Sequence, residues 1–449
     1  MIEITIEDMM RAAGGFWQGD KALLPRRPAD IVTDSRDAGE GSLFIAIKGE
    51  RTDGHKYIPN AVKQGALAIL CSEMGQPGEP RLVVPDVMTA MRQIAEYNRA
   101  RFSCPFIGVT GSVGKTTAKE MIAVVLSARY ETFKTPGSMN GQIGLPVTLM
   151  QLHSSHQAAV VEMGVSLFGE MHRLSELVRP DYAVFTNIGD AHLEAFHDRE
   201  GILREKSHIT DGMPCDGAVF VNGDDPLLAD ADFGHRTVRF GLGENCDVRA
   251  ENIERTTDAE LTCRICTKNG SFPVRVPAYG TYMIYSVLAA AAVGLELGMT
   301  EEEIAEGLTR YNTVGHRSRV VKTSRCTLID DCYNANPTSN RAAIDSMLGF
   351  PGRKVCILGD MREMGEASEM VHRQIGEYAV SKGVSLVITH GDEAKYISEA
   401  AGAAGVHYEN RSELLAALPE LIQRGDIVLV KASHGPNFVD IVAAIEALN

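Results

Sequence analysis

The sequence predicts a three-part α/β protein, and both its length and the order of its apolar runs support this fold class. Short apolar runs typical of buried strands alternate with helical sequence through most of the 449 residues. Such alternation favours mostly parallel sheets with helices on both faces. Because this length exceeds one ordinary domain, we expect a small N-terminal α/β domain (residues 1–85), a central domain with a mostly parallel sheet (86–312) and a C-terminal Rossmann-like α/β domain (313–449).

The predicted strands are short apolar runs between helical or polar segments. They lie at residues 42–47, 66–70, 82–85, 106–110, 158–161, 182–186, 218–221, 354–358, 385–389 and 427–430. A helical stretch at 87–101 opens the central region, and short alternating strands between 247 and 277 precede its Ala-rich helix.

Composition and charge exclude several classes of function. A net charge of −15 would repel phosphate, so general binding to nucleic acid or to an anionic membrane is not expected. The most apolar stretch, 285–299, contains Glu296 and two glycines and is interpreted as a core helix and not as a membrane span. The N-terminus is acidic and lacks the layout of a signal peptide, and nine scattered cysteines are typical of reduced thiols. We therefore expect a cytoplasmic protein without membrane insertion.

The strongest single motif is a phosphate loop at Thr110–Thr117. It follows a predicted buried strand and precedes a helix in which Ala118, Met121, Ile122 and Val125 share one face. A phosphate loop must lie in this position, after a strand and before a helix, and the helix N-terminus adds a favourable field for anions. The central sheet is therefore expected to be of the P-loop type.

Each residue type in this loop has a physical task in nucleotide binding. Backbone N–H groups from Gly111 to Gly114 can wrap phosphate oxygens, because glycine tolerates close approach and unusual dihedral angles. Lys115 can reach the terminal phosphates, and the Thr116 hydroxyl can bind Mg²⁺. The strict pattern fails at Val109, where its first glycine is expected. The alternative is an ordinary Gly-rich turn, which leaves Lys115 and Thr116 unexplained.

Polar residues near strand ends extend the predicted site. Glu162 ends one predicted strand and His192 lies in the loop after the next, so both are expected at the carboxyl edge of the sheet. A second Mg²⁺ could bind there, although magnesium prefers oxygen ligands. From the residues alone, Glu162 is a metal ligand or a helix-capping acid, and His192 is a ligand or a satisfied loop histidine. The spacing of Lys206 indicates a solvated lysine, and His172, His197 and His208 are interpreted as surface residues without a partner pattern.

Several strings together resemble the Mur ligases, a family of ATP-dependent enzymes that form amide bonds. They are Asp34–Arg36, Gly49–His55, Thr110–Glu120, Ser138–Pro146, Glu162–Gly164, Thr186–Glu194, Asp330–Pro337 and Leu358–Gly365. The resemblance covers essentially the whole chain, in order. Within the family, the Tyr333–Pro337 and Leu358–Met361 strings are similar to those of the members that add D-alanyl-D-alanine.

The resemblance implies a reaction between two substrates. ATP would phosphorylate the terminal carboxylate of UDP-N-acetylmuramoyl-tripeptide, and the amine of D-alanyl-D-alanine would attack the acyl phosphate to give the amide, ADP and phosphate. A carboxylate must be activated before an amine can attack it, and metal ions with Lys115 would reduce the repulsion between the anions. The implied cofactors are ATP and two Mg²⁺ ions, and a monomer is expected. Domain closure is expected as well, because the phosphate loop and Asp331 lie in different domains.

The resemblance also implies roles for individual residues. Catalytic roles fall to Lys115, Asn140, His192 and Lys206, the last as the family lysine that CO₂ carbamylates. Nucleotide contacts are implied for Gly111, Ser112, Gly114, Lys115, Thr116, Thr117, Arg317 and Asp331, and metal contacts for Thr116, Glu162 and His192. Contacts to the UDP-sugar are implied for Ser35, Arg36, Asp53 and His55, and contacts on the dipeptide side for Tyr333, Asn334 and Asn336.

Three positions depart from the family pattern. Val113 replaces the usual asparagine of the phosphate loop, and residues 280–286 replace a segment rich in histidine and asparagine that touches adenine. His434 stands where arginine is usual, so recognition of a carboxylate there would be weaker and dependent on pH. These departures affect adenine contacts and amine specificity more than the ATP chemistry.

The alternatives belong to different classes of protein. One is another amide ligase of the same superfamily with a different acid or amine, but the strings at 34–36 and 53–55 favour a UDP-sugar. A P-loop ATPase switch would leave Glu162 and His192 without a task. A degenerate, non-catalytic nucleotide-binding protein is not expected, because Lys115, Thr116 and Glu162 are all intact.

Overall fold

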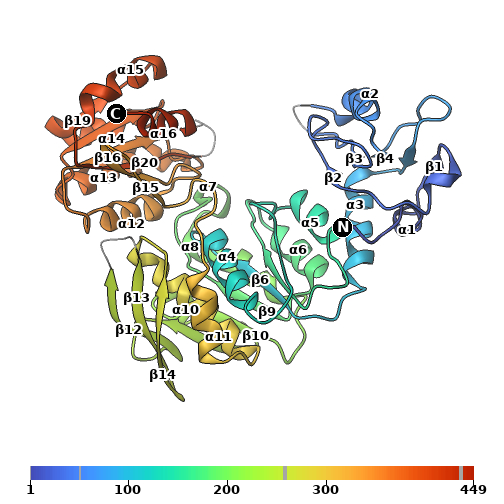
Figure 1. Cartoon of the computed structure of the whole chain (residues 1–449), viewed down its shortest axis with the longest axis horizontal. Helices are drawn as coiled ribbons and strands as arrows, with labels where there is room; N and C mark the ends of the chain where they lie inside the picture. The colour runs from blue at the N-terminus through green and yellow to red at the C-terminus, as the bar shows by residue number, and fades with distance from the viewer. Residues whose placement is uncertain (1, 50–51, 256–259, 434–437, 449) are drawn as a thin grey trace.

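The computed structural model describes residues 2–49, 52–255, 260–433 and 438–448. It contains three separate sheets with helices around them, and the predicted α/β fold class is confirmed. Figure 1 shows the N-terminal part in blue at the right, the central part from cyan to yellow in the lower middle, and the C-terminal part from orange to red at the upper left.

The N-terminal sheet has five short strands in the order β1-β5-β4-β3-β2, and β1 alone runs antiparallel to its neighbour. Its strands are β1 (Phe16–Gln18), β2 (Ile31–Val32), β3 (Leu43–Ile45), β4 (Ala68–Cys71) and β5 (Arg81–Val83). Its helices are α1 (Ile6–Ala13), η1 (Lys21–Leu23), η2 (Gly54–Tyr57) and α2 (Ile58–Lys63). The chain enters α1 through a capping box, in which the Thr5 and Asp8 side chains each accept a hydrogen bond from the other's backbone N–H.

Helix α3 (Val87–Arg99) joins the N-terminal and central parts. The Asp86 carboxylate starts it by accepting a hydrogen bond from a backbone N–H in the first turn. Met91 of α3 lies in one continuous apolar cluster with Met9 of α1 and Leu149 of the central part. This shared core fixes the two parts against each other.

The central sheet has nine strands in the order β14-β13-β12-β11-β10-β9-β6-β8-β7. The pairs from β7 to β12 are parallel, and β12, β13 and β14 form an antiparallel meander. The strands are β6 (Phe106–Thr110), β7 (Thr132–Lys134), β8 (Ala158–Glu162), β9 (Tyr182–Phe185), β10 (Ala218–Asn222), β11 (Arg236–Gly241), β12 (Val248–Arg255), β13 (Leu261–Thr267) and β14 (Gly270–Val276). The helices are α4 (Lys115–Leu126), α5 (Gly144–Met150), α6 (Glu170–Val178), α7 (Leu193–Phe196), α8 (Arg199–Ser207), η3 (His208–Thr210), α9 (Pro226–Ala229), η4 (Thr281–Met283), α10 (Ile284–Glu296) and α11 (Glu301–Thr309).

Helix α4 is the core helix of the central part. The face predicted from Ala118 to Val125 is fully buried, and α10 and α11 pack against it. A Cβ at Gly307 of α11 would lie 2.6 Å from the Val125 Cα, so only glycine permits this approach. Within the described part of the chain, no helix has the length and apolarity needed to cross a membrane.

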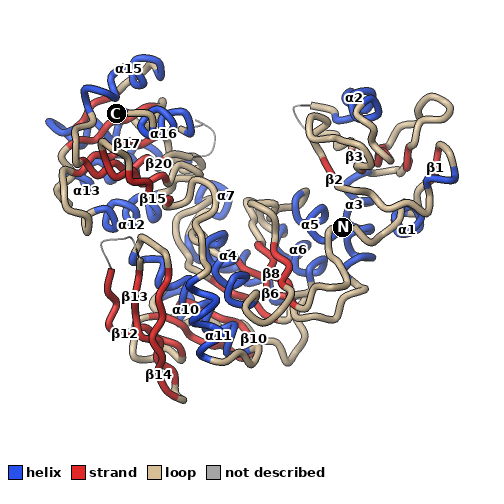
Figure 2. The backbone as a smooth tube through the Cα atoms, in the orientation of Figure 1, coloured by secondary structure: helices blue, strands red, loops and turns tan. Residues whose placement is uncertain are grey.

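The C-terminal sheet has six strands in the order β15-β16-β20-β17-β18-β19, and only β15 is antiparallel. Figure 2 shows these strands as a red layer between helices. The strands are β15 (Arg319–Lys322), β16 (Cys326–Asp330), β17 (Lys354–Gly359), β18 (Leu386–His390), β19 (Gly405–His407) and β20 (Asp426–Lys431). The helices are α12 (Pro337–Met347), η5 (Gly365–Ala367), α13 (Ser368–Ser381), α14 (Lys395–Ala401), η6 (Gly402–Ala404), α15 (Arg411–Leu421) and α16 (Val439–Glu446).

The central and C-terminal parts touch each other through an aromatic contact. Tyr279 stacks on Phe350 with ring centroids 5.0 Å apart, and the Arg255 guanidinium lies 5.1 Å from the Phe350 ring. Arg255 also donates a hydrogen bond of 2.9 Å to the Ser346 carbonyl. Residues at the carboxyl ends of β8 and of β16 and β20 consequently face one shared cavity.

Candidate active site

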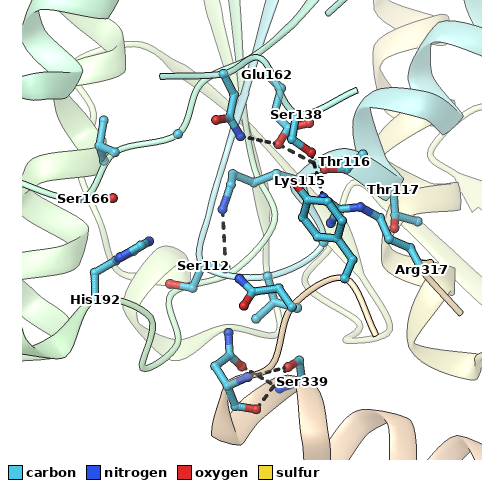
Figure 3. A pocket seen from close by; sticks show the side chains of 18 of the residues that line it. Ser112, Lys115, Thr116, Thr117, Ser138, Glu162, Ser166, His192, Arg317 and Ser339 are labelled. Carbon is cyan, nitrogen blue, oxygen red and sulfur yellow. Dashed lines mark hydrogen bonds between the residues drawn. The ribbon is translucent and has the colours of Figure 1, made fainter. Parts of the chain in front are cut away.

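A cavity of about 390 Å³ lies between the central and C-terminal parts. Thirteen of the residues predicted to act in catalysis or binding line it: Ser112, Gly114, Lys115, Thr116, Thr117, Asn140, Glu162, His192, Arg317, Asp331, Tyr333, Asn334 and Asn336. Figure 3 shows Lys115 and Thr116 near its middle, Glu162 above them, His192 and Arg317 on opposite flanks, and Ser339 on the side of α12. The structure thus brings residues from two domains to one place.

The phosphate loop has the backbone geometry that its glycines predict. Gly111 has φ 142° and Gly114 has φ 83°. A Cβ at Gly111 would lie 2.0 Å from the Thr186 Oγ1, so a side chain there is excluded. Gly114 directly precedes α4, and the loop therefore delivers the first turn of this helix to the cavity.

Two of the four loop N–H groups already have partners within the protein. The Ser112 N–H donates to the Asn187 carbonyl at 3.0 Å, and the Val113 N–H donates to the Asn187 Oδ1 at 2.9 Å. Asn187 therefore holds these two N–H groups of the loop, and phosphate binding by the loop N–H groups stays a prediction.

The Lys115 side chain folds back over its own loop. Its Nζ donates hydrogen bonds to the Gly111 carbonyl at 2.8 Å and the Ser112 carbonyl at 3.5 Å. Loss of hydration lowers the pKa of Lys115, and the nearby Glu162 carboxylate opposes this shift. The two carbonyl groups are neutral, so an anion in the cavity would give the Lys115 ammonium group a charged partner.

Glu162, Thr116 and Asn140 form one hydrogen-bonded cluster, in which Glu162 and Thr116 are buried. The Glu162 Oε1 accepts hydrogen bonds from the Thr116 hydroxyl at 3.1 Å and from the Asn140 Nδ2 at 2.6 Å. Its Oε2 is buried and accepts no hydrogen bond, although Glu162 is only 1% exposed. A buried carboxylate oxygen without a hydrogen-bond donor, next to the Thr116 hydroxyl, fits a hard cation such as Mg²⁺, which prefers oxygen ligands.

A buried lysine lies beneath this cluster. The Lys119 Nζ is 3.7 Å from the Glu162 Oε2 and 3.0 Å from the Glu120 Oε1. It also donates hydrogen bonds to the Thr135 and Gly137 carbonyls at 2.7 and 2.8 Å. Lys119 therefore places a positive charge next to the Glu162 carboxylate on the buried side of the cluster.

His192 lines the same cavity but does not contact Glu162 through a hydrogen bond. Its Nδ1 pairs with the Glu363 carboxylate of the C-terminal part. This contact leaves Nε2 as the ring nitrogen that could face a ligand. His192 adopts a left-handed backbone conformation with φ 63°, where it begins α7.

The spacing of Lys206 predicted a solvated lysine, and this prediction is wrong. Lys206 lies on α8 and is only 1% exposed. It is not among the residues that line the cavity. Burial lowers the pKa of Lys206 well below its ordinary value of 10.5, and repulsion from Lys115 adds to the shift. Next to it, the Glu205 carboxylate accepts hydrogen bonds from the Gly169 and Met171 N–H groups at the start of α6. Sequence spacing could not show this burial, because lysine is usually exposed.

His172 and His208 are exposed as predicted, but they have a common partner. Their Nδ1 atoms lie 2.6 and 2.9 Å from the same Asp211 carboxylate oxygen. The prediction that they have no partner is wrong, and the contact ties α6 to the turn after α8.

Arg317 connects the two domains across the cavity. Its guanidinium lies 3.7 Å from the centroid of the Tyr333 ring and donates a hydrogen bond of 2.9 Å to the Ser138 hydroxyl. Stacking on an aromatic face together with a directed hydrogen bond is an arrangement that suits arginine and not lysine. Ser138 received no role from the sequence, although it lies in one of the strings that carry the resemblance.

Asp331 is fixed by residues that the sequence left without a role. Its Oδ2 accepts a hydrogen bond from the Lys431 Nζ at 2.6 Å, and its Oδ1 accepts one from the Ser318 N–H at 2.9 Å. Lys431 also donates to the Asn334 carbonyl at 2.9 Å. Lys431 could have been found from the sequence, because it is a charged residue at the end of an apolar run that forms the buried strand β20. Tyr282 lines the same side, and its hydroxyl contacts the Ser318 hydroxyl.

The side chain of Asn336 has a structural task. Its Oδ1 accepts a hydrogen bond from the Ser339 N–H at 2.8 Å and caps α12. Because the cap uses the Oδ1, the predicted contact of Asn336 with the dipeptide would have to involve another atom of this residue. Tyr333 and Asn334 also line the cavity, and the Asn334 Oδ1 accepts a hydrogen bond of 2.9 Å from the Ala335 N–H.

The predicted sugar-binding residues do not lie at this cavity. The Ser35 Oγ and carbonyl lie 3.3 and 3.0 Å from the Asn60 Nδ2, and Arg36 pairs with Asp34 at the surface. Asp53 caps η2, and His55 is 9% exposed.

The His55 ring uses both of its nitrogen atoms. Nδ1 lies 2.7 Å from the Asp53 Oδ1, and Nε2 accepts a hydrogen bond from the Ser72 N–H at 3.0 Å. This ring therefore holds its own loop together. Residues 50 and 51 of the neighbouring string and His434 lie outside the described residues.

Comparisons with known proteins agree with this arrangement. Residues 109–294 match the Mur ligase middle domain, residues 316–434 the glutamate ligase domain of Mur ligases, and residues 29–99 the catalytic domain of the Mur ligase family. The UDP-N-acetylmuramoyl-tripeptide--D-alanyl-D-alanine ligase of Bacillus subtilis is 36% identical over 425 residues, which cover 92% of each chain. The enzyme of the same name from Escherichia coli is 35% identical over 454 residues, with 99% of each chain covered.

Solved structures give the same result. A crystal structure of MurF from Acinetobacter baumannii superposes with a TM-score of 0.89 at 32% identity and covers 98% of both chains. MurF ligase from Thermotoga maritima in complex with ADP superposes with a TM-score of 0.82 at 29% identity, covering 93% of this chain and 97% of that chain. The resemblance drawn from the sequence is confirmed: the chain belongs to the Mur ligase family.

Proposed function

We propose that the chain is an ATP-dependent, ADP-forming ligase that joins the terminal carboxylate of UDP-N-acetylmuramoyl-tripeptide to the amine of D-alanyl-D-alanine, in the cytoplasm, during synthesis of peptidoglycan precursors. The observation that carries this proposal is the meeting of Lys115, Thr116 and Glu162 with Arg317 and Asp331 around one cavity. Relatives named for this reaction, at 35–36% identity over nearly the whole chain, support the choice of substrates.

The proposed reaction proceeds in two balanced steps. A carboxylate oxygen of the tripeptide forms a bond to the γ-phosphorus of ATP, and the bridging bond to the β-phosphate breaks, so that ADP leaves. The neutral amine of the dipeptide then forms a C–N bond to the acyl carbon and loses a proton. The tetrahedral intermediate collapses as its C–O bond to phosphate breaks.

Residues of the central part would bind the phosphates. Lys115 would exchange its contacts with loop carbonyls for the β- and γ-phosphates, and the first turn of α4 would face their charge. Thr116 and Glu162 would hold Mg²⁺, with His192 beside them, and the ion would screen repulsion between the carboxylate and ATP. Asn140, bonded to Glu162, would keep this carboxylate aimed at the metal. A second Mg²⁺ belongs to the same proposal.

Lys206 would complete this side of the site as a carbamate. A lysine must lose its proton before it can react with CO₂, and the lowered pKa of Lys206 favours the neutral amine. The carbamate would be an anion in a buried place, where the charge of Lys115 and the metal would stabilise it. Mass spectrometry of the intact protein kept in bicarbonate would detect the added mass of CO₂, about 44 Da, and the Lys206→Ala variant would lack it.

Residues of the C-terminal part would close over the nucleotide. Arg317 and Asp331 would reach the nucleotide, while Tyr333 and Asn334 would face the dipeptide, with Asn336 fixing the start of α12 between them. Ser35, Arg36, Asp53 and His55 would hold the UDP-sugar in the N-terminal part. We assign the three domains to residues 1–85, 86–312 and 313–449, each with one of the three sheets, and propose that the enzyme acts as a monomer.

Phosphate release tests the proposal. Release from ATP and Mg²⁺ that requires both the UDP-linked tripeptide and D-alanyl-D-alanine, with a new amide in the product, is the expected result. Release that needs the tripeptide but prefers another amine would move the specificity and keep the ligase chemistry. Turnover indifferent to both substrates would replace the ligase with an ATPase switch.

A further inference from the structure

A histidine and a carboxylate meet across the two domains at the edge of the cavity. His192 belongs to the loop after β9, and Glu363 belongs to the loop between β17 and η5. The His192 Nδ1 contacts the Glu363 carboxylate, with side chains 25% and 55% exposed. Glu363 belongs to the Leu358–Gly365 string, in which no residue has received a role.

Both residues have an uncommon backbone conformation. His192 has φ 63° and Glu363 has φ 64°. A left-handed conformation is unfavourable for a non-glycine residue, and such residues persist where the surrounding structure fixes them. Among the described residues, six non-glycine residues have positive φ, and two of them, His192 and Ser318, line the cavity. With Glu363, three of the six therefore lie where the two domains meet.

The two loops are held from both sides. The backbone N–H of Met361 donates to the buried His372 Nε2 at 2.9 Å, and that of Arg362 donates to the Ser433 hydroxyl at 3.1 Å. On the other side, the Thr338 hydroxyl of α12 lies 3.4 Å from the Asp190 carboxylate, two residues before His192. The position of Glu363 is therefore set by the C-terminal domain, and its distance from His192 depends on how the domains approach.

The contact has a chemical consequence for the ring. A carboxylate at Nδ1 keeps the proton on that nitrogen and leaves the lone pair on Nε2. Histidines that bind metals usually have such a partner on the far nitrogen, which fixes both the tautomer and the ring orientation. Here the partner is contributed by a different domain from the histidine.

We propose that Glu363 is a positioning residue that completes the metal-binding side of the active site only in the closed enzyme, by holding His192 with Nε2 directed into the cavity. This inference rests on the proposed function. In an open enzyme His192 would lack this partner, so Mg²⁺ and the ATP phosphates would be held fully only after closure. ATP would thereby be protected from attack by water until the C-terminal domain is in place.

The variants Glu363→Ala and Glu363→Gln test the role, with Glu366→Gln as the matched control. Glu366 is an exposed carboxylate of η5, three residues further along the same loop. The first readout is the Mg²⁺ concentration needed for half-maximal ADP binding by calorimetry, without acid or amine substrate. Removal of a carboxylate behind a metal-binding histidine weakens metal affinity by about 10- to 100-fold. We expect this increase for Glu363→Ala, a smaller one for Glu363→Gln, and none for Glu366→Gln.

The second readout is the His192 ring itself. Long-range ¹H–¹⁵N spectra of protein labelled in histidine, with His192→Ala for assignment, should show the Nδ1–H tautomer in the wild type and its loss in Glu363→Ala. In the His192→Ala background, Glu363→Ala should have no further effect on the Mg²⁺ requirement. An unchanged tautomer and an unchanged Mg²⁺ requirement in Glu363→Ala would overturn the proposal. Because neither readout needs the ligation reaction, failure of this role and failure of the proposed function are distinguishable.

Discussion

The phosphate-loop region and the N-terminal region differ in how much of their hydrogen-bonding capacity the protein uses itself. In the first, the buried Glu162 Oε2 accepts no hydrogen bond, and Lys115 contacts only carbonyl groups of its own loop. In the second, His55 uses both ring nitrogens, and Arg36 pairs with its neighbour Asp34. The phosphate-loop region therefore keeps polar groups that a ligand could pair with, whereas the polar side chains of the N-terminal region pair with each other and hold its loops. Substitutions should therefore remove chemistry in the first and affect binding or local stability in the second.

The largest effect is expected for Lys115→Ala. Removing a positioned charge that stabilises the transition state costs about 10²- to 10³-fold in kcat. The measurement is phosphate release at saturating substrates, with the exposed Lys63→Ala as the control. A Lys115→Ala enzyme that keeps more than about half of the wild-type kcat would break the distinction between the two regions.

The next largest effect is expected for Glu162→Gln. The amide keeps an oxygen for Thr116 but removes the charge proposed to hold Mg²⁺, and it leaves Lys119 with one carboxylate fewer. We expect the Mg²⁺ requirement of the reaction to rise by about 10- to 100-fold. Titration of activity with Mg²⁺ measures this, and Glu131→Gln, an exposed carboxylate before β7, is the control. An unchanged Mg²⁺ requirement would remove Glu162 from the metal site.

A smaller effect is expected for Arg36→Ala in the N-terminal region. The side chain is 85% exposed, so the substitution should leave the Tm unchanged. If Arg36 contacts the UDP-sugar, the KM for the UDP-linked tripeptide should rise about fivefold with kcat unchanged, as for one hydrogen bond of about 1 kcal/mol. Steady-state kinetics with that substrate varied decide the matter. A fall in kcat at an unchanged KM would place Arg36 outside substrate binding.

The smallest effect, on stability, is expected for His372, because both of its ring nitrogens have hydrogen-bond partners, as in His55. His372 is fully buried, accepts from the Met361 N–H and donates from Nδ1 to the Ser368 carbonyl. Burial lowers the pKa of His372 below its ordinary 6.5. Below about pH 6.5 the unfolded chain then binds more protons than the folded one, so the free energy of unfolding falls as the pH falls toward the folded pKa.

Urea unfolding at several pH values between about 5 and 8 measures this loss. The His372→Gln variant cannot take up the proton, so its midpoint should depend less on pH than that of the wild type. The same pH dependence in both proteins would show that His372 does not contribute to it.

Local patterns predicted much of the fold and half of the site. Buried parallel strands are apolar throughout, so β6, β8 and β17 were found within one residue of their ends. Strands of two or three residues such as β2 and β19, and half-exposed strands such as β15, lack an apolar run and were not predicted. The phosphate loop could be predicted because its backbone geometry depends on neighbouring residues alone.

Other features depend on contacts between distant parts of the chain. The burial of Lys206 and the two donors from Ser112 and Val113 to Asn187 come from packing that no spacing encodes. The pair of His192 and Glu363 requires the relative placement of two domains.

The most direct test of the account follows an oxygen atom. If the tripeptide carboxylate is phosphorylated by ATP at this cavity, its oxygen must leave with the phosphate when the amide forms. UDP-linked tripeptide labelled with ¹⁸O in the terminal carboxylate, incubated with ATP, Mg²⁺ and D-alanyl-D-alanine, should give inorganic phosphate that carries one ¹⁸O atom per amide formed. Phosphate without ¹⁸O would show that ATP is hydrolysed by water, and would contradict the acyl-phosphate mechanism.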